Sequence, residues 1–390
     1  MRDSRRIIIG FAALALIAFV SGFAGVPCGL AQQKEPVKIG VLIPLTGSSG
    51  FGGERELRGI KIALEEINEL GGVLGGRPVK IIVEDTESRP KAGMDGIHKL
   101  VDVDKVPIVL GAHNSSVTIP TATYANSRGV VQISLASTSP DLHKIGPFHF
   151  SVVATDEIMG ADMVRFAMKD TGQKDFGILV MNDPYGVGLG RAMRKVIEDA
   201  GGRVVSEVRY ELNKSDYRAE LQRLFAPRPP AILSVAWAEM SRIIQKQAYE
   251  MGLSATVKDS WYSAYFADSV EACIPETVEG RKGLDVVAAK GPRFDEFAEK
   301  YRKLVGDKAE FISYYPPIAY DGMWIAALAI DMAGTTDPDT IRRVLPVTFK
   351  LYRGVSDPDM SVDEDGIQRT QIFQGYVYRD GKVVPYDVKW

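Results

Sequence analysis

The sequence predicts an α/β protein made of two lobes, each built on a central parallel β-sheet. Strand-like and helix-like segments alternate from residue 37 to residue 251, which is the pattern of a parallel sheet covered by helices on both faces. The first expected strand, residues 37–43, is almost continuously apolar, as in a strand that is buried on both faces, and residues 176–181 have the same character. The same order of segments occurs twice, offset by about 137 residues when Gly40 is set against Gly177.

The first half opens on a strand at residues 37–43, followed by a loop at residues 44–53 and a helix at residues 54–70. Apolar residues recur at helical spacing in that helix, and Gly71-Gly72 ends it. The other elements expected in this half are strands at residues 79–84, 106–110, 130–134 and 148–153, and helices at residues 90–103 and 115–127.

The second half repeats this plan and is followed by a less regular tail. Its expected strands lie at residues 176–181, 204–210 and 231–236, and its expected helices at residues 156–171, 184–200, 215–225 and 239–251. In the tail we expect strands at 278–287, 372–378 and 383–388, and helices at 294–305, 320–333 and 339–345. Because residues 292–345 are rich in helix and poor in strand, we expect them to return to the first two sheets rather than form a third domain.

Residues 1–31 have the composition of a secretory signal peptide. The segment opens with three arginines, continues with an apolar run at residues 7–20 and ends in small residues. We therefore expect export to the periplasm and cleavage after Ala31. A membrane anchor is the alternative, but the apolar run is short for a bilayer span. Cys28 raises the further alternative of a lipoprotein, which the preceding Pro27 fits poorly.

Charge, cysteine content and motifs exclude several classes of protein. Removal of the three arginines and one aspartate of the signal peptide leaves 44 basic and 49 acidic residues, which argues against a nucleic acid or an anionic membrane as partner. Only Cys273 then remains, so no internal disulfide is expected. The four histidines lack metal-ligand spacing, and neither a nucleophile elbow nor a phosphate loop occurs. We expect no catalytic activity, no metal and no cofactor.

Two clusters of hydroxyl residues follow neighbouring strands. Asn114-Ser115-Ser116 comes after the strand at residues 106–110, and Ser137-Thr138-Ser139 comes after the strand at residues 130–134, about 22 residues later. At the start of a helix such residues present hydroxyls beside free backbone N–H groups. Side by side at the carboxyl ends of parallel strands, the two clusters would form a small anion socket. Ordinary helix capping is the alternative.

A set of short motifs, taken in order and spacing, points to a known family. They are Pro44-Leu45-Thr46-Gly47, Gly71-Gly72, Glu84-Asp85, Ser115-Ser116 and Asn182-Asp183-Pro184-Tyr185-Gly186. In these motifs the chain resembles the periplasmic branched-chain-amino-acid-binding proteins of ABC transporters, over essentially its whole length after the signal peptide. The resemblance implies the type I periplasmic binding protein fold, with two Rossmann-like lobes joined by a three-crossover hinge.

The resemblance also implies how the chain is divided and how it works. The N-terminal lobe would take residues 34–152 and 290–355, and the C-terminal lobe residues 153–289 and 356–390. A monomeric protein would close on a small carboxylate ligand, such as a hydrophobic amino acid, and deliver it to an ABC permease in the membrane. A ligand sensor of the same fold is the alternative. We expect such a receptor to continue into a membrane span, whereas this chain ends at Trp390.

In that family the ligand carboxylate lies on backbone N–H and hydroxyl groups of the first lobe, and aromatic residues of the second lobe complete the site. The positions of this sequence that match the first group are Ser115, Ser116, Ser137 and Thr138. Those that match the second group are Tyr185 and Trp237. The hydroxyl residues agree with the socket expected from the strand ends.

Two departures from the family pattern leave the ligand open. Relatives that bind α-amino acids often carry a tyrosine in the first glycine-rich loop, where this chain has Phe51. They also pair the ligand ammonium with an acidic residue of the second lobe, at a position that falls near Trp261 or Tyr262 here. Because an unpaired buried ammonium is costly, either Asp259, Glu239 or Asp321 takes that role or the ligand has no ammonium.

The aromatic residues near these departures favour a second class of ligand. Phe51, Trp237, Trp261 and Tyr262 together would line an aromatic-walled cleft. Such a cleft suits an aromatic carboxylate, or a small amide without an ammonium group, as well as an aliphatic amino acid. Alternatively, Trp261 and Tyr262 only pack on the hinge side.

Overall fold

The first lobe is built on a five-stranded sheet in which every strand runs parallel to its neighbours, in the order β2-β1-β3-β4-β5. The computed structural model describes residues 34–287, 290–306 and 313–388, so the expected signal peptide and its cleavage site lie outside the described residues. The strands are β1 (Val37–Ile43), β2 (Val79–Asp85), β3 (Ile108–Gly111), β4 (Val131–Ser134) and β5 (His149–Ser151).

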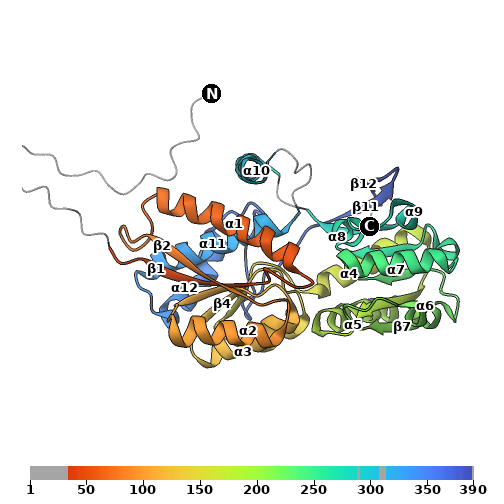
Figure 1. Ribbon diagram of the computed structural model, residues 1–390, viewed down its shortest axis with the longest axis horizontal. Helices are drawn as coiled ribbons and strands as arrows, with labels where there is room; N and C mark the ends of the chain where they lie inside the picture. Colours follow the sequence, from red (N-terminus) through yellow and green to blue (C-terminus); the bar gives the residue numbers. More distant parts are fainter. Residues whose placement is uncertain (1–33, 288–289, 307–312, 389–390) are drawn as a thin grey trace, which may run out of the picture. The chain divides into compact units, whose positions relative to one another are not determined.

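Helices cover both faces of this sheet (Figure 1). On one face, α1 (Gly50–Glu69) and α11 (Tyr315–Ala333) share a core with the strands, and α10 (Pro292–Val305) and α12 (Pro338–Leu351) join the same core. On the other face lie α2 (Pro90–His98) and α3 (Ser115–Ser127). The helix-rich segment late in the chain thus completes the first lobe, as expected from its shortage of strands.

The second lobe is built on a seven-stranded sheet in the order β12-β11-β10-β9-β8-β6-β7. Strands β6 to β10 pair in parallel, and β11 and β12 add an antiparallel edge. The strands are β6 (Asp175–Met181), β7 (Arg203–Tyr210), β8 (Ile232–Ser234), β9 (Trp261–Ala264), β10 (Lys282–Val286), β11 (Phe373–Arg379) and β12 (Lys382–Pro385). The helices are α4 (Asp156–Thr171), α5 (Pro184–Asp199), α6 (Arg218–Phe225), α7 (Ala238–Glu250), α8 (Phe266–Val270) and α9 (Pro275–Val278).

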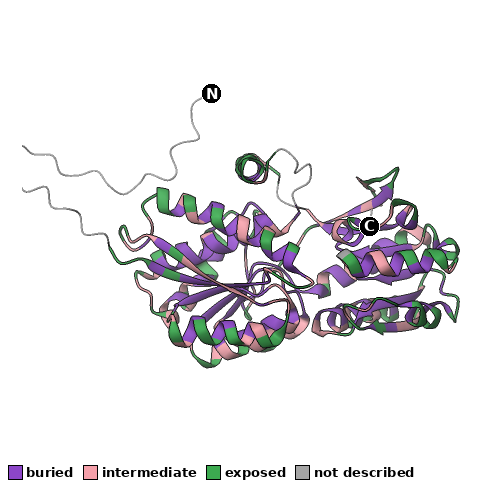
Figure 2. Cartoon of the chain, viewed as in Figure 1, coloured by how far each residue is buried: buried purple, intermediate pink, exposed green. Residues whose placement is uncertain are grey.

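The chain passes between the two lobes three times: after β5, after β10 and after α12. Each lobe has a separate hydrophobic core, and Figure 2 shows that the strands are buried while the helices expose their outer faces. The α/β class with largely parallel sheets is therefore confirmed. Among the described residues, no helix combines the length and apolarity needed to cross a bilayer.

Two glycines of α1 let the backbone of the first lobe approach closely. A Cβ atom at Gly53 would lie 1.8 Å from the Pro44 carbonyl oxygen, and one at Gly59 would lie 2.1 Å from that of Pro316 at the start of α11. These contacts leave no room for a side chain. They allow α1 to pack closely on the preceding loop and on α11; α1 itself begins at Gly50, inside the stretch 44–53 that the sequence predicts as a loop.

The structure differs from the expected elements at two further places. Residues 261–264, where the sequence predicts neither a strand nor a helix, form the central strand β9. The helix expected from residue 320 instead begins at Tyr315, and Pro316 and Pro317 lie in its first turn. Proline is tolerated there since the first N–H groups of a helix have no intrahelical partner.

The segment after α12 stays with the first lobe longer than the sequence suggests. Met360 and Val362 belong to the core of the first lobe, and Ile367 forms a parallel bridge with Ser151 at the end of β5. The expected change of lobe at residues 355/356 is therefore too early, because apolar side chains beyond that point are buried against the first sheet.

Candidate functional site

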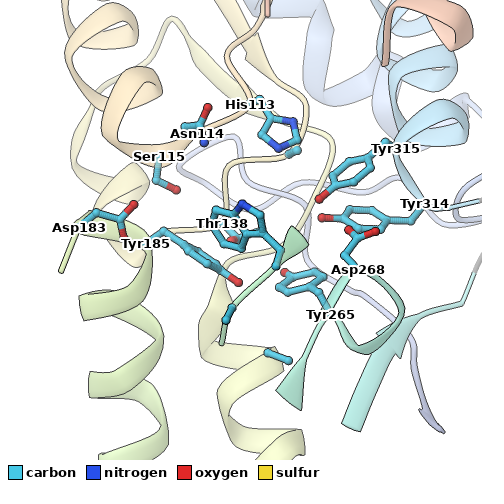
Figure 3. Close-up of a pocket in the computed structure, with 14 residues that line it drawn as sticks. His113, Asn114, Ser115, Thr138, Asp183, Tyr185, Tyr265, Asp268, Tyr314 and Tyr315 are labelled. Atoms are coloured by element: carbon cyan, nitrogen blue, oxygen red, sulfur yellow. The ribbon is translucent and has the colours of Figure 1, made fainter. Parts of the chain in front are cut away.

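A small cavity lies where the carboxyl ends of strands from the two lobes face each other (Figure 3). Its lining from the first lobe is His113, Asn114, Ser115, Ala136, Thr138, Tyr314 and Tyr315. Its lining from the second lobe is Asp183, Tyr185, Ala236, Trp237, Ala264, Tyr265 and Asp268. Ligands of open α/β sheets commonly bind at such strand ends.

The cavity is the inner part of a larger site. It encloses about 40 Å³, which is room for a few water molecules. An outer chamber of about 240 Å³ adjoins it and shares His113, Trp237, Asp268 and Tyr315 with it. A ligand the size of an amino acid would therefore need the outer chamber, or a slight parting of the lobes, as well as the inner cavity.

Ser115 supplies a hydroxyl donor on the wall of the first lobe. It is the first residue of α3, and its Oγ accepts a hydrogen bond from the backbone N–H of Ser139 at 3.3 Å. The hydroxyl proton thus remains available to a ligand, beside the N–H groups of the helix start. This end of α3 is suited to an anionic group.

Thr138 lies beside Ser115 but its hydroxyl is already engaged. Its Oγ1 donates to Asp156 Oδ2 at 2.7 Å, and Asp156 is fully buried at the start of α4. Asp156 Oδ1 accepts a second bond, from the hydroxyl of Tyr265 on the opposite wall, at 3.2 Å. A single carboxyl therefore contacts both walls of the cavity.

The other two expected socket residues do not line the cavity. Ser137 is buried behind it, where its Oγ donates to the carbonyl of His113 at 2.9 Å and contacts Thr118 Oγ1. Ser116 is half-buried on α3 outside the cavity lining. The socket thus consists of fewer side chains than the sequence suggests, because alternate positions after each strand turn toward the core.

Aromatic rings form most of the remaining wall. The ring of Tyr185 lies 5.5 Å from that of Trp237 and 6.3 Å from that of Tyr265, centroid to centroid. Tyr265 stacks on Tyr314 at 5.5 Å, and Tyr314 contacts Tyr315 at 4.2 Å. This wall suits the apolar part of a ligand or a cationic group.

Phe51 lies at the entrance, where it lines the outer chamber and is 52% exposed. The guanidinium carbon of Arg55 lies 3.5 Å from the centroid of its ring. Arg55 reaches from the first lobe to the second, with Nη2 at 3.3 Å from Glu271 Oε1 and Nη1 at 3.9 Å from Asp268 Oδ1. This ion-pair cluster bridges the two lobes at the mouth of the site.

Trp261, Tyr262 and Asp259 lie away from the cavity, which corrects the expectation that they form its second-lobe wall. Trp261 and Tyr262 are fully buried in β9. The indole of Trp261 donates to Ser234 Oγ at 2.8 Å, and the hydroxyl of Tyr262 donates to Asp170. Asp259 is exposed outside the cavity lining. The physical reason is that residues 261–264 form a central strand, whose side chains pack into the core.

The other two acids considered as ammonium partners also lie elsewhere. Glu239 is exposed on α7 and pairs with Arg242. Asp321 is fully buried in α11, where it accepts hydrogen bonds from the Tyr352 hydroxyl and from the backbone N–H groups of Val355 and Ser356. These bonds hold the segment that follows α12 against the first lobe.

The acids that do line the cavity are Asp183 and Asp268. Asp183 caps α5 by accepting from the N–H of Gly186 at 2.8 Å, and burial raises its pKa. The side chain of Asp268 is only 13% exposed, and its Oδ2 has no hydrogen-bond partner among the described residues. Burial raises the pKa of Asp268, and the positive charge of Arg55 and a hydrogen bond from Tyr315 oppose that rise. Asp268 is thus a partly satisfied acid that faces the site.

A histidine–glutamate pair stands behind the wall of the first lobe. His113 Nδ1 lies 2.9 Å from Oε1 of Glu56, which is fully buried on α1. Gly52 makes room for the imidazole, since a Cβ atom there would lie 2.6 Å from His113 Cε1. Glu56 fixes the orientation of the ring that lines both chambers.

Comparison with known proteins gives the family. A family model described as periplasmic binding protein matches residues 36–381. The chain belongs to the periplasmic binding protein family. Members of this family bind solutes outside the cytoplasm, and the predicted resemblance is confirmed.

Three similar proteins illustrate the range of this periplasmic binding protein's relatives. A Leu/Ile/Val-binding protein homolog from Brucella abortus is 25% identical over 95% of this chain and 96% of its own. The crystal structure of a leucine binding protein from Thermotoga maritima has a TM-score of 0.80 and 24% identity, covering 90% and 98% of the two chains. A solute binding protein from R. palustris, solved with 4-hydroxybenzoate, has a TM-score of 0.76 and 21% identity, covering 91% and 96%. The two structures confirm the fold.

Several residues of the site could not be predicted from the sequence. Tyr265 has a left-handed backbone with φ of 51°, which is unusual for an aromatic residue and has no sequence signature. Asp268 lies on a helix of five residues, too short to show periodicity. Tyr314 and Tyr315 precede two prolines that read as a break. For Asp183 a signal exists, since Asp-Pro is a common helix start.

Proposed function

We propose that this periplasmic binding protein is the ligand-capturing component of an ABC importer. It takes up a branched-chain or other hydrophobic amino acid by closure of the two lobes and delivers it to a membrane permease. The observation that carries the proposal is the enclosed site, with a hydroxyl and a helix start on one wall and aromatic rings with Asp268 on the other. This arrangement suits a carboxylate at one end of a ligand and an ammonium with an apolar side chain at the other.

The charges around the site favour an amino acid over a ligand that carries only a carboxylate. Asp183, Asp268 and Glu271 line the two chambers, and Arg55 forms ion pairs with Asp268 and Glu271 but not with Asp183. One further positive charge, brought by the ligand, would offset part of this acidic excess. We infer that Asp268 takes the role that the sequence assigned to Asp259, Glu239 or Asp321.

An aromatic carboxylate is the second candidate ligand. The aromatic wall and the R. palustris structure with 4-hydroxybenzoate support it. A small amide without an ammonium group is a ligand of the same kind. Both differ from an amino acid in that binding requires no amine on the ligand. A sensory role for the same site is a separate alternative, in which the ligand is detected rather than delivered to a permease.

Ligand identification tests the proposal directly. Residues 32–390 would be purified from the periplasm, and any ligand that co-purifies would be released and identified by mass spectrometry. After removal of that ligand, thermal unfolding would be followed with leucine, valine, phenylalanine, benzoate and 4-hydroxybenzoate. A ligand at 100 times its Kd contributes about 2.7 kcal/mol to stability, which is readily detected as a rise in Tm. A chain that no small carboxylate or amide stabilises would contradict a solute-binding role.

Export and assembly belong to the same proposal. We propose cleavage after Ala31, which N-terminal sequencing of the periplasmic protein would detect. We also propose that the processed protein acts as a monomer and meets the permease in its closed, ligand-bound form. A mass equal to that of one chain in light scattering is the expected result.

The socket on the first lobe gives one testable prediction. Ser115→Ala combined with Thr138→Ala is expected to weaken carboxylate binding by roughly 100-fold or more, because each hydrogen bond to a charged group contributes about 1.5–3 kcal/mol. Isothermal calorimetry measures the change. The matched control is Thr123→Ala with Ser127→Ala on the exposed side of α3. Equal affinity in the two double variants would remove the socket from the mechanism.

The ion pairs of Arg55 at the mouth of the site give a second testable prediction. Arg55→Gln is expected to raise the ligand dissociation rate about 5- to 30-fold with little change in association, because the partly shielded ion pairs form only when the lobes are together. Stopped-flow fluorescence of Trp237 is the measurement. Arg58→Gln is the control, since Arg58 pairs with Glu54 on the same helix. A change confined to the association rate would argue against a closing role.

A further inference from the structure

Asp156 is a buried carboxyl that the proposed function leaves without a role. It is the first residue of α4, just after the first crossing between the lobes, and it is fully buried. Its backbone N–H donates to the Thr138 carbonyl at 2.7 Å, its Oδ2 accepts from Thr138 Oγ1 and its Oδ1 from the Tyr265 hydroxyl. It is therefore in direct contact with one ligand-facing residue of each lobe.

No cation compensates this carboxyl among the described residues. The titratable groups that act on it or respond to it are Asp183, before α5, and the phenols of Tyr185 and Tyr265. Burial raises the pKa of Asp156 to about 8; the hydrogen bonds from Thr138 and Tyr265 oppose the rise and Asp183 adds to it. Asp156 thus changes its protonation state within the pH range in which a periplasmic protein can be studied.

Protonation of Asp156 determines whether the Thr138 hydroxyl can donate a hydrogen bond to a ligand. An ionised carboxylate only accepts hydrogen bonds, so it draws the hydroxyl protons of Thr138 and Tyr265 toward itself. Thr138 then presents lone pairs to the cavity, which repel a carboxylate. A protonated Asp156 can donate to Thr138 Oγ1 instead, and the Thr138 proton becomes free to point into the cavity.

We propose that Asp156 is a positioning residue that holds a proton whenever the site holds a carboxylate, so that ligand capture is coupled to proton uptake at the hinge. This inference rests on the proposed function, because it requires an anionic group beside Thr138. The first crossing between the lobes would then take part in ligand binding by holding a proton, in addition to its part in lobe closure. Since binding favours the protonated form, affinity must fall as the pH rises through the range in which Asp156 ionises.

The test compares wild-type protein with Asp156→Asn by calorimetry, using leucine as probe and benzoate as a second probe, between pH 6 and pH 9. For the wild type we expect constant affinity up to about pH 7 and a loss that approaches tenfold per pH unit above about pH 8. The asparagine amide can donate to Thr138 at every pH, so the variant should show a flat profile. Asp162→Asn on the same helix is the control, since Asp162 pairs with Arg165 away from the cavity. It should keep the wild-type profile.

A second measurement needs no variant at residue 156. Titrations of the wild type at pH 8.5 in two buffers of different ionisation enthalpy give the number of protons taken up with the ligand, for which we expect between about one half and one. Zero uptake, or parallel pH profiles for wild type and Asp156→Asn, would overturn the inference while leaving the proposed function intact. If neither probe, nor any ligand released from the purified protein, binds at pH 6.5, both fail.

Discussion

Asp268→Asn is expected to weaken leucine binding by ~30-fold to more than ~1,000-fold. Removing one partner of a buried charge pair typically costs about 2–5 kcal/mol, because the remaining charge stays buried without compensation. Here the remaining charge would be the ligand ammonium beside Asp268 Oδ2, which has no other partner among the described residues. The measurement is calorimetric titration of the wild type and the variant with leucine.

The same variant separates the two candidate ligand classes when a matched ligand is included. The carboxylate 4-methylpentanoate has the carbon skeleton of leucine without the amine. If the ligand is an amino acid, wild-type protein prefers leucine strongly, and Asp268→Asn removes most of that preference. Asp259→Asn is the control, since Asp259 is exposed outside the cavity. Equal affinity of the wild type for both ligands would instead favour a carboxylate without an ammonium group.

Asp321→Ala is expected to lower the free energy of unfolding by about 3–5 kcal/mol. Its carboxyl accepts bonds from Tyr352, Val355 and Ser356 in the segment after α12, and alanine would leave these buried donors unpaired. Burial raises the pKa of Asp321, and the hydrogen bonds from these donors oppose the rise. The measurement is urea unfolding of the ligand-free protein.

A surface aspartate provides the comparison. Asp95→Ala removes an exposed pair with Lys91 on α2 and should change stability by no more than about 0.5 kcal/mol. If Asp321→Ala unfolded at the same urea concentration as Asp95→Ala, the segment after α12 would not depend on these hydrogen bonds for its stability. Ligand affinity of the folded Asp321 variant should stay within a few fold, because the residue does not line the cavity.

The sequence predicts the architecture better than the site. Strand β1 is almost continuously apolar because both of its faces are buried, with Lys38 as its exposed residue, and the glycines after α1, α5 and α7 mark the ends of these helices in the sequence. Ser115, Thr138, Tyr185 and Trp237 could be expected at the cavity because they lie within four residues of a strand end and match the family pattern.

The rest of the site depends on tertiary structure that leaves no local pattern. β9 has four residues of mixed polarity, and its burial follows from its central place in the sheet. The aromatic residues Trp261 and Tyr262 therefore wrongly suggested a ligand-facing wall. Asp268 reaches the cavity only because a short helix follows that strand. Tyr314 and Tyr315 come from a segment that is remote in sequence and is brought to the site by the packing of α11 on α1.

The discontinuous lobes have a consequence for the order in which this chain can fold. The core of the first lobe requires α11 and α12, which end at Ala333 and Leu351, and the sheet of the second lobe requires β11, which begins at Phe373. A chain that emerges from its N-terminus therefore cannot complete either core until almost its whole length is available. Both cores therefore depend on contacts between segments that lie far apart in the sequence, and we expect the two lobes to fold late and together.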